Sequence, residues 1–245
     1  MVRKIAVAAY THNGRVRSNN EDCVAVGNWV QGDAMSAPQY FEQELGLPLV
    51  CMVLDGMGGH ADGEVASRLS AEYLVRELPA CMDEIEISQC IAQANLNLFG
   101  YMRTHPSHLG MGTTLAGVRI DPDSVLAFNV GDSRVYRTQD GFLAQLSVDD
   151  VQRAPGNPNR SNILTQSLGG TPYPVEIEAH LSRSKVSQPR TYLLCSDGLY
   201  DALDLEQIES AINEDVVASA QLLMERSLAA GARDNVSVVL IRVST

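Results

Sequence analysis

The sequence predicts an α+β fold in which β-sheets pack together and helices lie outside them. The first observation is the order of the expected elements, which runs from strands to two consecutive helices, back to strands, and then to one helix and one strand. A parallel sheet would instead show a regular alternation of strand and helix. The second observation is composition, because 45% apolar and 20% charged residues in a chain of 245 are typical of a globular protein with a large core.

The N-terminal half is expected to hold three strands and two helices. Apolar runs bounded by turn-forming residues indicate the strands, and apolar residues at steps of three and four indicate the helices. The expected strands cover 4–10, 23–26 and 49–54. The expected helices cover 62–78 and 88–103. Ser88 is the expected N-cap of the second helix.

Strands dominate the C-terminal half. The expected strands cover 113–120, 125–130, 134–138, 142–146, 175–181, 191–195 and 235–243. A helix is expected over 215–229, again from its apolar spacing. The polar loop over 150–162 is too short to link two separate cores, so we expect one domain over 1–245.

Charge and cysteine usage narrow the functional class. With 18 basic and 30 acidic residues the net charge is −12, which argues against nucleic-acid partners and a polybasic membrane contact. Five scattered cysteines without a CxxC pair indicate a reducing compartment. The apolar stretch at the N-terminus is too short for a signal peptide, and no apolar run approaches the ~20 residues of a membrane span. We therefore expect a cytoplasmic, soluble protein. We also expect it to be a monomer.

Four segments share one pattern, an apolar strand that ends in aspartate before a small residue or tight turn. They are MVLDGMGGH (52–60), FNVGDSR (128–134), LLCSDGL (193–199) and GARDNVSV (231–238). One such aspartate is usually only a turn former, but strand ends at one edge of a sandwich can bring four carboxylates together. Oxygen-only ligands select magnesium or manganese rather than zinc. Two such cations can activate a water for attack on phosphorus.

A fifth segment, GRVRSNNED (14–22), adds positive charge. An arginine fork binds a phosphate group through two hydrogen bonds, so Arg15 and Arg17 are candidate phosphate ligands. Taken alone, the segment is equally consistent with a solvated, charged turn.

Together these segments resemble the metal-dependent serine/threonine protein phosphatases of the 2C type (the PPM family) in their bacterial form. The matching stretches, in family order, are GRVRSNNED at 14–22, LDGMGGHADGEVAS at 54–67, MGTT at 111–114, NVGDSRVY at 129–136, QLS at 145–147, NILTQSLG at 162–169, LLCSDGL at 193–199 and DNVSVVL at 234–240. The resemblance implies two packed antiparallel β-sheets flanked by α-helices, an αββα sandwich. It also implies that a metal-bridging hydroxide hydrolyses phosphoserine and phosphothreonine in protein substrates, opposing a cognate serine/threonine kinase.

The resemblance also implies a ligand set for Mn²⁺ or Mg²⁺. Asp55 matches the aspartate that bridges two central ions, and Gly56 contributes its backbone carbonyl to one of them. Asp197 and Asp234 match the remaining carboxylates of this pair. Asp132, together with Asp197, matches a third and weaker metal position.

The resemblance assigns further roles around these ions. Arg17 matches the phosphate-binding arginine, and Glu21 and Asp22 match acids that hold metal-bound waters and orient it. Asn235 matches a residue that supports the turn after Asp234.

Three positions depart from the family pattern. Animal enzymes carry a histidine, proposed as the general acid, where this chain has Met57; the nearest histidine, His60, is our candidate catalytic residue in its place. The usual Asp-His pair after the QLS segment reads Asp149-Asp150. The flap at about 148–161 is short and polar, which predicts a mobile lid and low selectivity among phosphomonoesters.

The stretch 28–47 has two interpretations. Its aromatic residues Trp29, Tyr40 and Phe41 could form a docking surface for substrate, because aromatic side chains are common interface anchors. Alternatively, they pack the stretch onto the core.

Two other functions stay open from the sequence. A pseudophosphatase that only binds phosphoproteins would be expected to lack one of the metal aspartates, yet all four are present. The stretch 121–125 matches the DxDxV motif of haloacid dehalogenase-type phosphatases, with Asp121 as nucleophile, although a strand rather than the required helix is expected to follow. A dinucleotide loop at 56–63 lacks the GxGxxG spacing.

Overall fold

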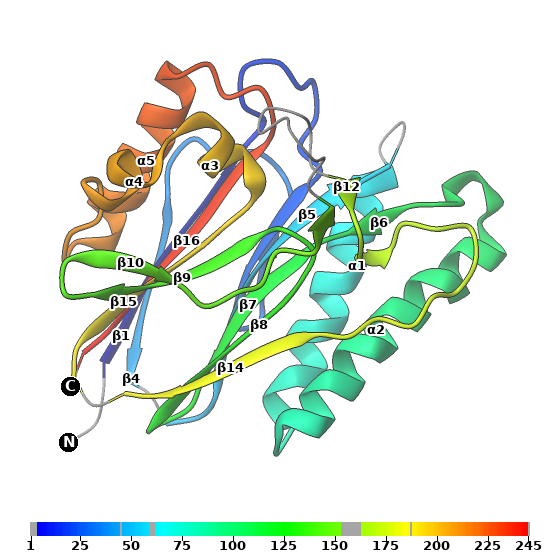
Figure 1. Cartoon of the computed structure of the whole chain (residues 1–245), viewed down its shortest axis with the longest axis horizontal. Coiled ribbons are helices and arrows are strands. Elements are labelled where there is room, and N and C mark those ends of the chain that lie inside the picture. The colour runs from blue at the N-terminus through cyan, green and yellow to red at the C-terminus, as the bar shows by residue number, and fades with distance from the viewer. Residues whose placement is uncertain (1–3, 45, 59–61, 153–162, 187, 245) are drawn as a thin grey trace.

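Two β-sheets pack face to face at the centre of the molecule, and helices cover both outer faces (Figure 1). The structure is a computed structural model that describes residues 4–44, 46–58, 62–152, 163–186 and 188–244. The arrangement confirms the predicted α+β fold and its αββα layers.

The first sheet has the strand order β10-β9-β15-β16-β1-β4, and its neighbouring strands are antiparallel. Its strands are β1 (Lys4–His12), β4 (Gln39–Glu44), β9 (Arg134–Gln139), β10 (Phe142–Gln145), β15 (Arg190–Cys195) and β16 (Val236–Val243). The central strands β15 and β16 are almost entirely buried because the second sheet covers one face and helices cover the other.

The second sheet has the strand order β13-β6-β5-β7-β8-β14, and β2 also pairs with β5 and with β3. Its strands are β2 (Asp22–Val26), β3 (Trp29–Gln31), β5 (Leu49–Met57), β6 (Gly112–Thr113), β7 (Leu115–Ile120), β8 (Ser124–Val130), β13 (Leu168–Gly169) and β14 (His180–Lys185). A separate pair is formed by β11 (Val151–Gln152) and β12 (Ile163–Leu164). β5 pairs with β2 on one side and with β7 and then β6 on the other, so its C-terminal end is fixed from both sides.

Helices α1 (Asp62–Glu77) and α2 (Glu84–Thr104) cover the second sheet, and α3 (Asp197–Ala202), α4 (Leu205–Glu209) and α5 (Val216–Ala229) cover the first (Figure 1). Short 3-10 turns follow α1 at Leu78–Ala80 and α2 at Pro106–His108. Apolar side chains are buried in three clusters, one between the sheets and one under each group of helices. Their burial stabilises the packing of helices on sheets and of sheet on sheet. None of the described helices is both long and apolar enough to cross a membrane.

Most expected elements are present, and the exceptions have local causes. Helix α2 begins at Glu84 because Asp83 caps it by accepting a hydrogen bond from the Glu86 N–H, so Ser88 lies inside the helix and is not its N-cap. The strand expected over 175–181 is instead β14, whose position is set by pairing along the full length of β8. Helices α3 and α4 were not predicted because they are too short to show a helical period.

The stretch 28–47 contributes two strands, β3 and β4, to the sheets. Trp29 lies in β3 and Phe41 in β4, and their ring centroids are 5.2 Å apart. Both side chains pack against the core between the sheets. Of the three aromatic residues, only Tyr40 is exposed, so packing rather than docking explains Trp29 and Phe41.

Candidate metal centre

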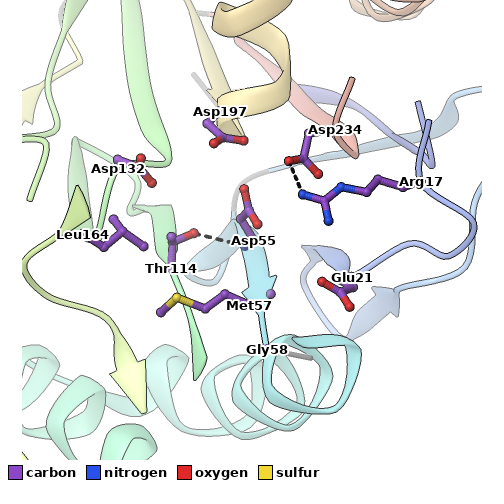
Figure 2. A pocket seen from close by; sticks show the side chains of 11 residues that line it. Arg17, Glu21, Asp55, Met57, Gly58, Thr114, Asp132, Leu164, Asp197 and Asp234 are labelled. Carbon is purple, nitrogen blue, oxygen red and sulfur yellow. Dashed lines mark hydrogen bonds and ion pairs between the residues drawn. The ribbon is translucent and has the colours of Figure 1, made fainter. Parts of the chain in front are cut away.

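The four strand-end aspartates of the sequence pattern meet in one pocket of about 250 Å³. Figure 2 shows Asp55 in the middle of it, with Asp132 and Asp197 on one side and Asp234 on the other. The pocket is lined by Arg17, Glu21, Asp55, Gly56, Met57, Gly58, Thr114, Asp132, Leu164, Asp197 and Asp234.

The peptide groups of Asp55 are held by hydrogen bonds from the next strands, near the end of β5. Its N–H donates to Thr114 Oγ1 at 3.0 Å, and its carbonyl accepts from the Thr114 N–H at 2.8 Å and from Thr113 Oγ1 at 3.0 Å. Gly56 follows because a Cβ at this position would collide with the carbonyl oxygens of Gly63 and Glu21. The backbone around Asp55 is therefore closely confined.

The other three aspartates come from neighbouring ends of the first sheet and from one turn. Asp197 is the first residue of α3 and follows β15 after Ser196. Asp234 precedes β16, the strand paired with β15, with only Asn235 between them. Asp132 lies in the turn between β8 and β9. Pairing of β15 with β16 thus brings Asp197 and Asp234 to the same end of the sandwich.

Glu21 and Asp22 occupy different positions. Glu21 lines the pocket, and its N–H donates to Asn235 Oδ1 at 2.8 Å. Asn235 also donates to the Asn19 carbonyl at 2.9 Å, so it joins this loop to the loop that carries Asp234. Asp22 is buried behind the pocket, opposite Asp55 in the β2–β5 pairing, and accepts from Ser196 Oγ at 2.7 Å.

Arg17 lies at the rim, where its guanidinium donates to Asp234 Oδ2 at 2.7 Å (Figure 2). The hydrogen bond and charge of Asp234 raise the pKa of Arg17. About half of the Arg17 side chain (52%) is exposed, so the fork remains accessible to a ligand in the pocket.

The carboxylates repel one another in this buried environment. Burial, followed by the charges of neighbouring aspartates, raises the pKa of Asp55 well above its usual range and that of Asp197 to about 7. Burial likewise raises the pKa of Asp132 to about 6 and that of Asp22 to about 6. A divalent cation would relieve this repulsion, which is the behaviour expected of a metal-binding pocket.

The donor set fits hard cations. All candidate ligands are oxygen atoms, and buried Asp197 Oδ1 has no hydrogen-bond partner among the described residues. No three His, Cys, Asp or Glu side chains in the described part of the chain are close enough to enclose one ion. Carboxylates spread around the pocket suit cations that keep several water ligands, as Mg²⁺ does.

Two sequence expectations lie partly or wholly outside the described residues. His60 is one of them, and the flap expected at about 148–161 is described only as far as Gln152. Met57, which stands where animal enzymes have histidine, lines the pocket. Sequence reasoning gave no role to Thr114, although the MGTT stretch was a signal that could have identified it.

A sandwich of two antiparallel sheets with an acidic pocket at one end defines an αββα protein with a site suited to divalent cations. The chain belongs to the protein phosphatase 2C family, whose model matches residues 28–237.

Two curated relatives illustrate the family. The chain is 31% identical over 253 residues to the serine/threonine protein phosphatase PstP of Mycobacterium tuberculosis, covering 96% of this chain and 44% of PstP. It therefore spans less than half the length of that relative. It is also 31% identical to the serine/threonine phosphatase stp of Listeria monocytogenes, covering 94% of this chain and 93% of stp.

Solved structures give the same relationship. The crystal structure of Mycobacterium tuberculosis PstP superposes with a TM-score of 0.80 at 30% identity and covers 99% of this chain. Another PstP structure, of the catalytic domain with two manganese ions, also has a TM-score of 0.80. PppA of Pseudomonas aeruginosa has a TM-score of 0.76 at 26% identity.

Proposed function

We propose that this chain hydrolyses phosphoserine and phosphothreonine esters in proteins, with Mn²⁺ or Mg²⁺ as cofactor, and that it opposes a serine/threonine kinase. The observation that carries the proposal is the convergence of Asp55, Asp132, Asp197 and Asp234 on one pocket with Arg17 at its rim. The names of the PstP and stp relatives and the manganese-containing PstP structure support it.

Five of the pocket residues have a proposed part in binding the cofactor. Asp55, the Gly56 carbonyl, Asp197 and Asp234 would hold two central cations, and Asp132 with Asp197 would hold a third. When bound, such a cation pair lowers the pKa of water and supplies a hydroxide for attack on phosphorus at neutral pH.

Arg17 and Glu21 complete the proposed site. The Arg17 fork would bind two oxygens of the phosphate group and orient it, releasing or sharing its bond to Asp234. Glu21, on the wall of the pocket, would accept hydrogen bonds from water ligands.

A cysteine nucleophile is not consistent with the structure. Cys23, Cys51, Cys90 and Cys195 are buried, and Cys81 is half-buried. Burial raises the pKa of all five thiols, in Cys23, Cys90 and Cys195 to about 12, so none is a thiolate at neutral pH. None of them lines the pocket.

The haloacid dehalogenase-type alternative is not favoured either. Asp121 lies in the turn between β7 and β8, where it forms an ion pair with Arg119 at 3.1 Å. The strand β8, not a helix, follows it, and Asp121 is not part of the pocket.

The test is turnover of a phosphoserine peptide and of a chromogenic phosphomonoester by the purified chain. We expect activity with Mn²⁺, none with EDTA, and no covalent phosphoryl-enzyme. Asp55→Asn should abolish turnover, whereas the matched Asp121→Asn should not. Phosphopeptide binding without turnover would instead support a pseudophosphatase, and full activity in EDTA would refute the metal-dependent mechanism.

A further inference from the structure

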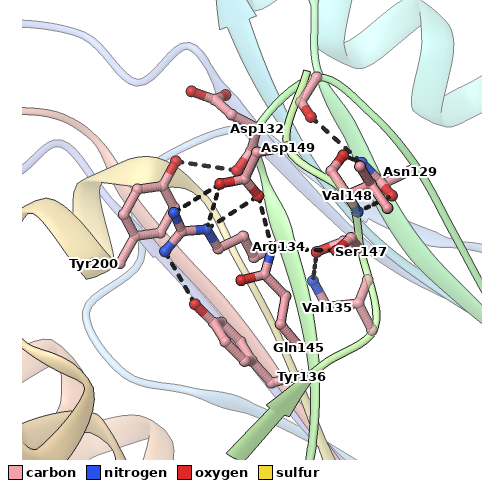
Figure 3. Close-up of polar contacts among 11 residues, drawn as sticks. Asn129, Asp132, Arg134, Val135, Tyr136, Gln145, Ser147, Val148, Asp149 and Tyr200 are labelled. Carbon is pink, nitrogen blue, oxygen red and sulfur yellow. Dashed lines mark hydrogen bonds and ion pairs between the residues drawn. The ribbon is translucent and has the colours of Figure 1, made fainter. Parts of the chain in front are cut away.

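The turn at 131–134 carries Asp132. Side-chain hydrogen bonds join this turn and the residues that flank it to the segment 147–150, and Figure 3 shows those of Ser147, Val148 and Asp149. Ser147 Oγ accepts from the Val135 N–H at 3.0 Å. The Asn129 side chain donates to the Val148 carbonyl at 2.7 Å and accepts from the Val148 N–H at 3.0 Å. Residues 147 and 148 are therefore fixed beside the two ends of the turn.

Asp149 holds the C-terminal side of the turn. Its carboxylate accepts three hydrogen bonds from Arg134, at 2.7, 3.1 and 3.2 Å, and one from Gln145 at 2.7 Å. The Arg134 guanidinium also lies 3.6 Å from the ring centre of Tyr200 in α3. Tyr200 in turn donates its hydroxyl to the Asp132 carbonyl at 3.0 Å (Figure 3).

Asp150 holds the N-terminal side. Its Oδ2 accepts from the Gly131 N–H at 2.9 Å, and its own N–H donates to the Gly131 carbonyl at 3.0 Å. Gly131 has φ +94°, a conformation that favours glycine. Asp150 Oδ1 bonds to Gln166 Nε2 and to His180 Nε2, both at 2.9 Å, and the Asp150 carbonyl accepts from the Thr165 N–H at 2.8 Å.

We propose that Asp149 and Asp150 are positioning residues that clamp the 131–134 turn from both sides and thereby fix the Asp132 carboxylate in the pocket. Asp150 also connects this turn to 163–166, a segment whose Leu164 lines the same pocket. The two adjacent carboxylates thus join the turn that carries Asp132 to the segment 163–166. The inference rests on the proposed function only in taking Asp132 as a cation ligand.

The Asp150 carboxylate cannot be replaced by an amide without loss. It receives hydrogen bonds from Gly131, Gln166 and His180 on its two oxygens. In Asp150→Asn one of these oxygens becomes an NH₂ group, which faces a donor and cannot accept from it. Whichever oxygen is replaced, residue 150 loses at least one of these hydrogen bonds, and those that remain no longer have a charged acceptor.

The experiment measures Mn²⁺ binding to the full chain, using the paramagnetic resonance signal of free Mn²⁺, so it does not depend on turnover. Asp150→Asn should weaken the weakest class of bound Mn²⁺ about 10-fold, as the loss of a hydrogen bond to a charged group predicts. The tighter classes should change less than about twofold. The matched control is Asp140→Asn, in an exposed turn where φ is +52° and asparagine is tolerated; it should bind Mn²⁺ as the parent does.

A double variant shows whether Asp150 acts through Asp132. Asp132→Ala should remove the weakest class, and adding Asp150→Asn to it should change nothing more. His180→Ala is a milder variant, because it removes only one hydrogen-bond donor to Asp150 and His180 is half-buried. It should weaken the weakest class of bound Mn²⁺ by a smaller factor than Asp150→Asn does, and it provides a test if Asp150→Asn folds poorly.

Three results would overturn the proposal. The positioning role would be refuted if the weakest class of Mn²⁺ sites kept its affinity in both Asp150→Asn and His180→Ala, or if all classes lost affinity equally. Neither result would contradict the proposed function. A parent chain that binds no Mn²⁺ would refute the proposed function as well.

Discussion

Asp55 and Asp132 reach the same pocket but are held there by different kinds of bond. Asp55 lies in β5, and its backbone is fixed mainly by pairing within the sheet, with the Thr113 and Thr114 hydroxyls bonded to the same peptide groups. Asp132 lies in a turn that the side chains of Arg134, Asp149 and Asp150 hold in place. A sheet ladder is lost only when the sheet opens, whereas side-chain contacts are lost one at a time. The Asp55 side is therefore rigid, and the Asp132 side is adjustable by single substitutions.

The largest expected contrast comes from removing the ligands themselves. Asp55→Ala, Asp197→Ala and Asp234→Ala should each lower kcat/KM at least about 1,000-fold, because a catalytic cation supplies several kcal/mol of transition-state stabilisation. Asp132→Ala should lose activity mainly at limiting Mn²⁺ and recover much of it at high Mn²⁺. The measurement is a Mn²⁺ titration of initial rates for all four variants.

Near-normal activity of any of the first three variants would show that its aspartate is not a ligand. A loss in Asp132→Ala that high Mn²⁺ cannot restore would remove the distinction between the two sides. Folding of the variants is checked by circular dichroism, since removing one acid from a repelling cluster should not destabilise the cation-free protein.

The difference between sheet pairing and long-range side-chain contacts also explains which features the sequence could predict. Strands with buried, apolar runs such as β5 and β16 carry their pattern locally, and the aspartate at or beside the end of each strand is visible in it. Their convergence then follows from the packing of two sheets. The family resemblance supplied the roles of the aspartates, which composition and spacing alone did not.

The rest depends on contacts between residues distant in sequence. Ser196 donates to Asp22 across 174 positions, and Thr114 contacts Asp55 across 59. In the sequence, Asp149-Asp150 is visible only as a difference from the Asp-His pair of the family. Nothing near these residues indicates that Asp150 bonds to His180 of β14. Such partners are set by tertiary packing and leave no periodic signal.

The second contrast is between the cation-free and the Mn²⁺-bound protein as pH changes. The pKa values of Asp55, Asp197 and Asp132 are raised in the folded state, so between about pH 4 and 7 the folded chain binds more protons than the unfolded chain. Stability of the cation-free protein should therefore fall as pH rises through this window, by several kcal/mol. Mn²⁺ should reverse the fall near pH 7, because it binds the ionised, folded form.

Thermal unfolding with EDTA and with Mn²⁺, from pH 4.5 to 7.5, measures this effect. Asp197→Asn removes one raised carboxyl and should flatten the decline, while Asp140→Asn should leave it unchanged. Stability that rises with pH in EDTA would contradict the repulsion inferred for the pocket.

A third, smaller effect concerns Arg17, which is held in the pocket by a side-chain hydrogen bond to Asp234. Arg17→Ala should raise KM for a phosphopeptide about 10-fold with little change in kcat, because the fork binds phosphate equally in the ground and transition states. Arg17→Lys should recover little, since an ammonium group lacks the two-pronged geometry. A fall in kcat at constant KM would instead assign Arg17 to the transition state.

The smallest expected effect tests the Thr114 hydroxyl, which contacts both the Asp55 side and the Asp132 side of the pocket. Thr114 Oγ1 accepts from the Asp55 N–H at 3.0 Å and shares a hydrogen bond of 2.7 Å with Ser133 Oγ, next to Asp132. Thr114→Val keeps the shape but leaves the Asp55 N–H unpaired, which should lower the free energy of unfolding by about 1–2 kcal/mol. Thr114→Ser keeps the hydroxyl and should lose less stability, as measured by urea unfolding.

If the two sides are independent, Thr114→Val and Asp150→Asn should be additive in their effects on Mn²⁺ affinity. A coupling above about 0.5 kcal/mol would show that Thr114 transmits changes between the two sides.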